Sequence, residues 1–237
     1  MFKQRARGSE LLDGPDGDPT LAQRSYAFMR AVNRIGGGTG AVRRFLAAEL
    51  PRCSDDQPVR VLDLGAGGCD IPLSLGRWAN RKGWTLEFTC VDHNRAALEM
   101  AAQAIDRSNG TTIRLEQADI FTYRPCADFD YAIGSMVFHH FTAAEISRLI
   151  EHLRLFVRRA LLINDLRRTA LNYALCAALA WPLAAEIRHD ALLSVRRGFR
   201  RADLLQLLKR HAPEPVIETS WFSRITGVVR FDREGTR

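Results

Sequence analysis

The sequence predicts a doubly wound α/β fold with one mostly parallel sheet of seven strands, and three observations carry this prediction. From Val59 onward, short apolar runs alternate with amphipathic runs at helical spacing, as in parallel sheets covered by helices on both faces. A turn with three glycines, 65–68, follows the first apolar run. The last two apolar runs, 216–222 and 225–231, are joined by a tight turn, which is expected to make the final strand antiparallel.

Length and composition fit a single α/β domain preceded by a small helical cap. The chain has 237 residues, enough to bury a core that needs no covalent staples. Its five cysteines are well separated and form no C-x-x-C pair, which argues against a zinc ribbon or a disulfide framework and favours a reducing, cytoplasmic setting. Residues 1–10 hold basic side chains without an apolar stretch, so we expect no signal peptide.

The chain is basic, with a formal net charge of +7. A charge of this sign suits an anionic partner, such as RNA or a membrane surface. The arginines and lysines are spread along the sequence rather than gathered in one tail, however, which favours a solvated basic surface. We therefore expect no nucleic-acid partner and leave peripheral membrane contact open.

Residues 1–54 are predicted to form an N-terminal helical cap. Asp18 and Pro19 are typical of a helix cap and a first helical residue, apolar side chains then follow at helical spacing, and glycines 36–38 end the run. A second helix is expected from Thr39 or Gly40 to Leu50. The pair precedes the first strand, so it either covers the mouth of a cofactor site or simply packs beside the sheet.

The second part of the chain, 55–237, is predicted to be the α/β domain. Its first five strands are expected at 59–64, 85–91, 113–117, 129–135 and 157–164, with helices at 72–81, 95–107 and 143–154. After the fifth strand the alternation breaks at a lid insertion, 166–201, which has a helix from Thr169 and a basic, loop-like exit at 194–199. Another helix is expected at 201–210.

Three carboxylates stand at or just beyond the ends of consecutive predicted strands: Asp63, Asp92 and Asp119. In an open parallel sheet, ligands bind in the crevice beyond these strand ends. An acid that closes the second strand can accept hydrogen bonds from both hydroxyls of a ribose, and Asp119 with its apolar neighbour Ile120 can hold an adenine. Together with a glycine turn that lets a ligand lie on bare backbone, they predict a nucleoside cofactor.

The glycine turn also narrows the type of cofactor. A dinucleotide fingerprint needs a small residue at its last position, where Asp70 stands in the run from Gly65 to Asp70, and this argues against NAD and FAD. No lysine followed by serine or threonine comes after the glycines, which excludes a phosphate-binding P-loop.

These motifs resemble those of the class I S-adenosylmethionine-dependent methyltransferases. The run 63–69 is similar to their D-x-G-x-G-x-G signature, and 129–141 is similar to the fourth motif of the UbiE-like small-molecule branch. The resemblance implies S-adenosylmethionine as the cofactor and S-adenosylhomocysteine as the product. It departs at Cys69, where the family has a third glycine; we expect the turn to survive with a backbone that avoids positive φ.

The cofactor-binding residues that the resemblance implies follow the ends of the first four predicted strands. They are Asp63, Gly65, Ala66, Gly67, Asp92, His93, Asp119, Ile120, Ser135 and Met136. The glycine turn would meet the methionine part with backbone groups, Asp92 would hold the ribose, and Asp119 and Ile120 the adenine. Ser135 and Met136 would line the pocket beside the reactive methyl.

Candidates for the site of the methyl acceptor follow the fourth and fifth strands and lie in the insertion. His139 or His140 is predicted to remove the acceptor's proton or to orient the acceptor, since a histidine titrates near neutral pH; the alternative is that they cap the next helix. The candidates for substrate binding are His140, Asp165, Arg167, His189 and Arg197. No set of metal ligands is predicted.

The insertion begins with an apolar run, 170–181, that is hydrophobic nearly all round and is followed by Pro182. The run is shorter than the ~20 residues that a membrane span needs. We interpret it as a lid over a hydrophobic pocket, and favour this interpretation over docking to a membrane through the flanking arginines.

The predicted function is methyl transfer to a small, aromatic or lipophilic acceptor of polyketide or quinone type, at oxygen rather than carbon. A nucleic-acid methyltransferase is one alternative, but 134–138 after the fourth strand read Gly-Ser-Met-Val-Phe and not the Asp/Asn-Pro-Pro-aromatic motif of amino-methylating enzymes. A non-catalytic binding protein on the same fold is the other. The acceptor and the oligomeric state, monomer or homodimer, stay open.

Overall fold

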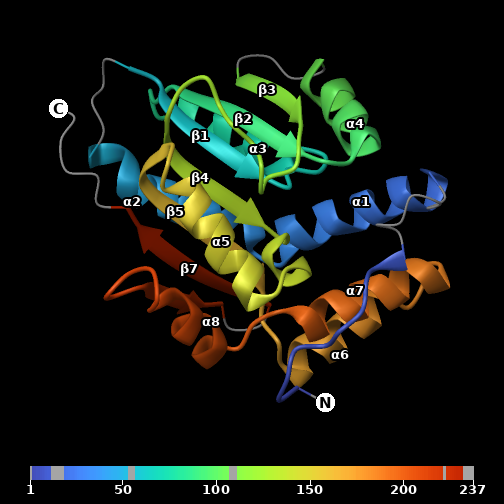
Figure 1. Cartoon of the computed structure of the whole chain (residues 1–237). Helices are drawn as coiled ribbons and strands as arrows, with labels where there is room; N and C mark the ends of the chain where they lie inside the picture. The colour runs from blue at the N-terminus through green and yellow to red at the C-terminus, as the bar shows by residue number, and fades with distance from the viewer. Residues whose placement is uncertain (1, 12–18, 53–56, 107–110, 221–222, 232–237) are drawn as a thin grey trace.

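A seven-stranded sheet forms the central layer of the protein, in the order β3-β2-β1-β4-β5-β7-β6 (Figure 1). The computed structural model describes residues 2–11, 19–52, 57–106, 111–220 and 223–231. Strands β1 to β5 pair in parallel, and β7 runs antiparallel to both of its neighbours, β5 and β6. The predicted doubly wound sheet with an antiparallel last strand is confirmed.

The elements of the described chain follow one another in the expected alternation up to β5. The strands are β1 (Val59–Leu64), β2 (Leu86–Asp92), β3 (Thr112–Gln117), β4 (Phe129–Ser135), β5 (Val157–Leu166), β6 (Val216–Thr219) and β7 (Arg224–Arg230). The helices are α1 (Pro19–Ile35), α2 (Gly38–Glu49), α3 (Asp70–Asn80), α4 (Arg95–Asp106), α5 (Ala143–Leu153), α6 (Ala170–Ala180), α7 (Ala185–Arg197) and α8 (Arg201–Leu208). Two 3₁₀ helices are η2 (Leu50–Arg52) and η3 (Phe138–His140).

Helices cover both faces of the sheet, because each strand points successive side chains to opposite faces. On β1, Val59 and Val61 pack in one buried cluster with residues of α2 and α3. Leu62 and Leu64 belong to a second buried cluster, which includes residues of α5 and α8. The mostly apolar sequence of β1 is thus explained by burial on both sides, as is typical of parallel strands.

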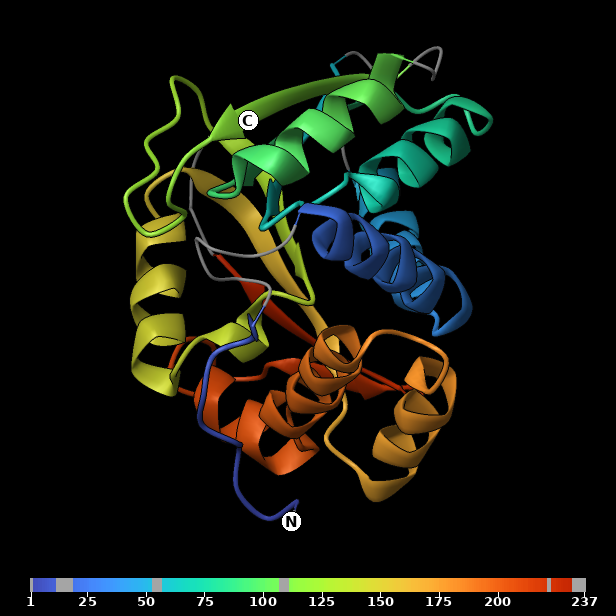
Figure 2. The ribbon, with the colours of Figure 1, turned by 90° about the vertical axis from the view of Figure 1, so that its right-hand side faces the viewer.

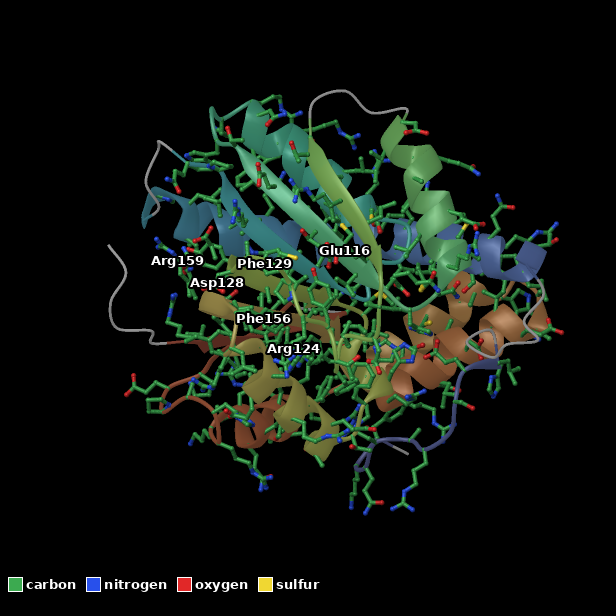
Figure 3. The ribbon with its side chains drawn as sticks, turned by 45° about the horizontal axis from the view of Figure 1, so that its top comes forward. Glu116, Arg124, Asp128, Phe129, Phe156 and Arg159 are labelled. Atoms are coloured by element: carbon green, nitrogen blue, oxygen red, sulfur yellow. The ribbon has the colours of Figure 1, made fainter. Side chains whose placement is uncertain are left out.

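Aromatic side chains close the core at the beginning of β4 and β5. Phe129 donates a backbone hydrogen bond to the carbonyl of Phe156 (2.8 Å), and both side chains are buried. Figure 3 labels the two phenylalanines together with Asp128 and Arg159, which stand at the same edge. The glycine turn lies at the other end of the strands.

The helices outside the alternating core gather at the carboxyl ends of the strands. In Figure 1 the arrowheads of β1 and β4 point towards the side where α1, α6 and α7 lie. Helices α6 and α7 pack against each other, and α7 also contacts α1 and η3. Among the residues that the structure describes, no helix combines the length and apolarity needed to cross a membrane.

The bounds of several elements differ from the sequence-based expectation. The basic run 194–199 is no loop: as far as Arg197 it is the last turn of α7, where Val195 and Arg197 are buried. Strand β5 continues to Leu166, because its last residues pair with β7. Strand β6 ends at Thr219. The predicted helix cap Asp18 and the last two residues of the predicted strand 216–222 lie outside the described residues.

Cys69 adopts the backbone conformation that the sequence predicted it to avoid. Its φ of 54° lies in the left-handed region, as do those of Gly65 (61°) and Gly67 (52°) in the same turn. This conformation costs a residue with a side chain about 1–2 kcal/mol. The prediction was wrong because the side chain of Cys69 is fully buried in the cluster with α2 and α3, and this burial offsets the strain.

Replacing Cys69 by valine tests the strain in the turn. A β-branched residue at positive φ is an outlier and its extra methyl overfills a buried site, so we expect Cys69→Val to lower the free energy of unfolding by about 2–4 kcal/mol. Denaturant unfolding followed by circular dichroism measures this change. The control is Cys126→Val at an exposed position, expected within about 0.5 kcal/mol of wild type. Equal stability of the two variants would contradict the strained turn.

Candidate active site

A cavity of about 550 Å³ opens beyond the carboxyl ends of β1, β2 and β4. The order of the strands reverses here, since β1 lies between β2 and β4, and open α/β sheets bind ligands at such a point. We call it the polar cavity. The predicted cofactor-binding residues that line it are Gly65, Ala66, Gly67, Asp92, His93, Asp119, Ile120, Ser135 and Met136.

Asp92 ties the glycine turn to the end of β2. Its Oδ2 accepts a hydrogen bond from the backbone N of Gly67 (2.8 Å), and its Oδ1 accepts one from the backbone N of Asn94 (2.9 Å). The backbone N of Gly65 donates to the carbonyl of Val91 (2.8 Å), also at the end of β2. A carboxylate has about four acceptor sites, so Asp92 keeps the capacity to bind hydroxyl groups of a ligand.

Asp63 is absent from the wall of the polar cavity. It is buried at the end of β1, where desolvation, together with the charges of Asp70 and Asp92, raises its pKa well above the usual value. Burial also raises the pKa of Asp70 in the first turn of α3, although Nδ2 of Asn33 donates to its carboxylate (3.4 Å). Asp63 therefore lies behind the residues that line the polar cavity, although it was predicted to bind the cofactor.

Besides Ser25, helix α1 contributes Tyr26, Arg30 and Asn33 to the polar cavity, and the sequence did not predict a site role for any of them. The ring of Tyr26 lies 3.4 Å from the place that a Cβ on Gly67 would take, and the guanidinium of Arg30 lies 3.9 Å from the equivalent place on Gly68. The spacing i, i+4, i+7 puts the three on one helix face and is the signal that could have located them.

Met136 follows β4 in the left-handed conformation, with a φ of 59°. Its backbone N donates to the carbonyl of Asn164 (2.9 Å), and its Sδ accepts from Nη2 of Arg224 (3.1 Å). Arg224 is almost fully buried, which lowers its pKa to about 10, and its Nη2 also donates to Oδ1 of Asn33 (2.7 Å). A strained residue held from several sides is a frequent mark of a functional site.

A second cavity, of about 280 Å³, adjoins the first under α6 and α7. We call it the apolar cavity, because hydrocarbon and sulfur side chains of α1, α6 and α7 dominate its wall. They include Phe28, Met29, Val32, Leu175, Cys176, Leu179, Ile187 and Val195. Both cavities are lined by Glu10, Ser25, Met29, Met136 and Asp190. The two cavities therefore meet beside Met136.

The two histidines predicted to be catalytic occupy different environments in η3. His139 is 2% exposed; its Nδ1 lies 2.8 Å from Oδ1 of Asp165, and its backbone N donates to the other carboxylate oxygen (3.0 Å). Burial alone would lower the pKa of His139, but the charge and hydrogen bond of Asp165, with those of Glu10, outweigh burial and raise it to about 9. His140 is more exposed and lines the polar cavity.

The N-terminal segment 2–11 runs beside α7 and contacts η3 (Figure 2). Arg5 holds it there: its Nε donates to the carbonyl of Arg197 (2.7 Å) and its Nη2 to the carbonyl of His139 (2.8 Å). Together with further bonds to α7, these contacts carry Glu10 to the junction of the cavities. Glu10 could not be predicted as a site residue, because it stands in a run without periodicity.

Glu10 stands next to both histidines. Its Oε1 lies 3.4 Å from Nε2 of His139 and 3.8 Å from Nε2 of His140, and it accepts a hydrogen bond from Oγ of Ser194 (2.6 Å). Burial opposes ionisation, but the hydrogen bond and charge of His139, the charge of His140 and the Ser194 hydroxyl outweigh it and lower the pKa of Glu10 to about 2. Glu10 is therefore an anion at neutral pH.

Asp165 and Arg197, both predicted to bind substrate, contact the histidines and do not line either cavity. Asp165 is fully buried behind His139. Arg197 is buried as well, and donates from Nε to the carbonyl of His139 (3.1 Å) and from Nη2 to the carbonyl of His140 (2.7 Å). The hydrogen bonds of the Asp165 carboxylate and the Arg197 guanidinium hold η3 against β5 and α7. The two residues therefore position the histidines.

Arg167 and His189, the other predicted substrate contacts, also lie outside both cavity walls. Arg167 donates from Nη1 to the carbonyl of Ser220 (3.2 Å), so its guanidinium points towards the end of β6. The side chain of His189 is 54% exposed, and its Nδ1 lies 3.0 Å from Oδ1 of Asp190. It is Asp190, the neighbour of His189, that reaches both cavities.

Part of the chain matches a known protein family. Residues 61–160 match the methyltransferase domain. The matched segment runs from β1 into β5, so it holds the glycine turn, Asp92, Asp119 and η3, and ends before the insertion. No curated protein matches the chain in sequence.

Solved structures share the methyltransferase fold over most of the chain. The plantazolicin methyltransferase BpumL, in complex with S-adenosylhomocysteine, is 14% identical with a TM-score of 0.65 over 90% of this chain and 94% of that one. The magnesium protoporphyrin IX methyltransferase ChlM from Synechocystis PCC 6803, with bound S-adenosylmethionine, is 16% identical with a TM-score of 0.55 over 93% and 88%. The CMeT domain of the citrinin polyketide synthase is 12% identical with a TM-score of 0.58 over 81% and 52%. At these identities the likeness shows the fold.

Proposed function

We propose that this protein transfers a methyl group from S-adenosylmethionine to the oxygen of a small, aromatic or lipophilic acceptor. The observation that carries the proposal is the pair of adjoining cavities, one polar at the glycine turn and one apolar under α6 and α7, which meet beside Met136. A nucleoside cofactor in the first and an apolar acceptor in the second would have their reacting ends in one place. Transfer from a sulfonium is an in-line displacement, whose chief demand is such alignment.

The polar cavity offers partners for each part of S-adenosylmethionine. The free acceptor sites of Asp92 suit the two ribose hydroxyls, and Asp119 with the buried Ile120 suits the amine and the face of the adenine. The methionine end would lie on the bare backbone of the glycine turn. There the guanidinium of Arg30 is placed to pair with the cofactor's carboxylate.

The apolar cavity supports an acceptor that is largely hydrocarbon. Its wall is built by α1 and by the insertion helices α6 and α7, so we propose that residues 1–54 act as a cap and 166–201 as a lid over an α/β domain. Two of the structurally similar proteins are named as methyltransferases of plantazolicin and of magnesium protoporphyrin IX, which are small-molecule acceptors. A nucleic-acid acceptor is not favoured, because such partners need basic and aromatic groups where this cavity presents aliphatic ones.

His140 is proposed to activate the acceptor, and His139, which is buried and lines neither cavity, is proposed to position the His140 ring. A hydroxyl group must lose its proton before its oxygen can displace the sulfonium, and a histidine near the reacting oxygen meets this need. His140 lines the polar cavity, and Glu10 between the two histidines reaches both cavities. Transfer to oxygen is therefore favoured over transfer to carbon, which the UbiE-like resemblance would equally allow.

Asp92→Asn tests the cofactor site. Loss of the charge weakens the bonds to both ribose hydroxyls, so we expect the Kd of S-adenosylmethionine, measured by calorimetry, to rise about 10- to 100-fold. Asp130→Asn is a matched control, since Asp130 also accepts from a backbone N, that of Arg60 (2.9 Å), but lies outside the polar cavity. An unchanged Kd in Asp92→Asn would remove Asp92 from the ribose site.

Leu175→Trp tests the apolar cavity. With methyl-labelled S-adenosylmethionine, we expect turnover of a series of phenols and hydroxypyrones to rise with the length of their alkyl chain. An indole at Leu175 fills the cavity, so kcat/KM for the longest acceptor should fall more than tenfold while the Kd of S-adenosylmethionine stays within twofold. The control is Leu171→Trp on the same helix, where the side chain is 52% exposed. Equal losses in both variants would place the acceptor elsewhere.

His140→Ala tests acceptor activation. We expect kcat to fall about 10²- to 10⁴-fold, the range of general acid–base contributions, with the Kd of S-adenosylmethionine unchanged. His211→Ala is the control: this imidazole bonds Glu151 (2.8 Å) and Ser147 (3.0 Å) and lies outside both cavities. Full activity of His140→Ala would leave only positioning to this residue.

A further inference from the structure

Three atoms that can bind a metal ion converge where the two cavities meet. They are Oε1 of Glu10, Nε2 of His139 and Nε2 of His140, and all lie within 4.8 Å of one another. We propose that these three side chains bind one divalent transition-metal ion, of which zinc is the representative, and that the ion holds the acceptor's oxygen. The inference rests on the proposed function, because it assigns the activation of the acceptor to this ion.

The distances fit a metal centre with little adjustment. Zinc binds histidine nitrogen and carboxylate oxygen at about 2.0–2.2 Å in a tetrahedron, which sets the ligand atoms about 3.3 Å apart. Oε1 of Glu10 lies 3.4 Å from Nε2 of His139 and 3.8 Å from Nε2 of His140. The centroids of the two imidazole rings lie 4.3 Å apart with an interplanar angle of 36°, and both Nε2 atoms approach the same carboxylate oxygen. Two nitrogens and one oxygen are a donor set that zinc and its neighbours prefer.

His139 is prepared as a ligand by its buried partner. Its Nε2 is buried and faces Oε1 of Glu10 at 3.4 Å, whereas its Nδ1 lies 2.8 Å from Oδ1 of Asp165. A proton on Nδ1, donated to Asp165, leaves the lone pair of Nε2 directed towards Glu10. Metal-binding histidines almost always donate their second nitrogen to a carboxylate or carbonyl in this way, which fixes the ring and makes it a better ligand.

The charges around the cluster call for a cation. Glu10 and Asp165 place two carboxylates on opposite sides of the His139 ring, and Asp190 lines both cavities nearby. A divalent ion bound at Nε2 of His139 offsets these negative charges, and the donors of Arg197 and Arg5 to the η3 carbonyls keep the two rings in place.

The position of the cluster leaves one side of the ion open to the acceptor. Glu10 borders both cavities and His140 the polar one, so a fourth ligand would enter from the junction beside Met136. An acceptor hydroxyl bound there would release its proton to solvent, as metal-bound water does near neutral pH. The oxygen anion then forms a bond to the methyl carbon, the carbon–sulfur bond breaks, and its electron pair stays on sulfur as the neutral thioether.

Metal binding can be measured without turnover. The full chain is treated with EDTA, dialysed and titrated with zinc by calorimetry and with cobalt by visible absorption. We expect one ion per chain and cobalt bands of a four- or five-coordinate site. Glu10→Gln and His140→Ala should each weaken zinc binding at least tenfold, whereas Glu186→Gln and His211→Ala, outside the cluster, should bind zinc as wild type does. Glu10→Gln keeps the test valid if His140→Ala does not fold.

The outcomes separate this inference from the proposed function. Fewer than 0.1 ions per chain, or zinc binding that neither cluster variant weakens, overturns the metal site; the proposed function then stands if S-adenosylmethionine still binds and turnover survives in EDTA. Loss of turnover in EDTA that zinc or manganese restores, with an unchanged Kd of S-adenosylmethionine, supports the metal site. Absence of S-adenosylmethionine binding sinks the proposed function, whatever the ion does.

Discussion

The carboxylate of Asp92 is the contact on which the polar cavity depends. It joins the backbone of the glycine turn after β1 to the end of β2, so two strand ends that meet only in the folded sheet define one wall. The turn needs three left-handed residues in close succession, and two glycines and a buried cysteine provide them. Because the bare backbone at Gly65 and Gly67 faces the cavity, a ligand can approach the chain itself.

The apolar cavity is built by segments that do not belong to the sheet. Helices α1, α6 and α7 surround a cavity that the common α/β core would leave open to water. The cavity accounts for part of the apolar surface of α6, that of Leu175 and Cys176, whereas Leu171 on the same helix is 52% exposed. In the proposed function, the α/β core would bind the cofactor, and the added helices would select the acceptor that meets it beside Met136.

Local sequence was sufficient for the sheet and for most of the polar cavity. The strands β1 and β4 have their predicted bounds, because a parallel strand that is buried over most of its length is a mostly apolar run whatever its neighbours are. The roles of Asp165, Arg197 and Glu10 could not be read in this way. Each depends on η3 folding back over β5 and α7, a contact between distant parts of the chain that no periodicity records. The same contact buries the basic end of α7, which looks like a loop in sequence.

The attachment of the N-terminal segment has a consequence for the order in which the molecule matures. Glu10 and its partner Ser194 are 184 positions apart, so this contact closes one of the longest loops in the chain. Long-range closures form late, since their entropic cost must be met before they stabilise anything. Glu10 can therefore join the histidines only after α7 and η3 have packed together, because Ser194 and the carbonyls that hold Arg5 belong to these two elements. The carboxylate of Asp165, by contrast, reaches His139 from within the sheet itself.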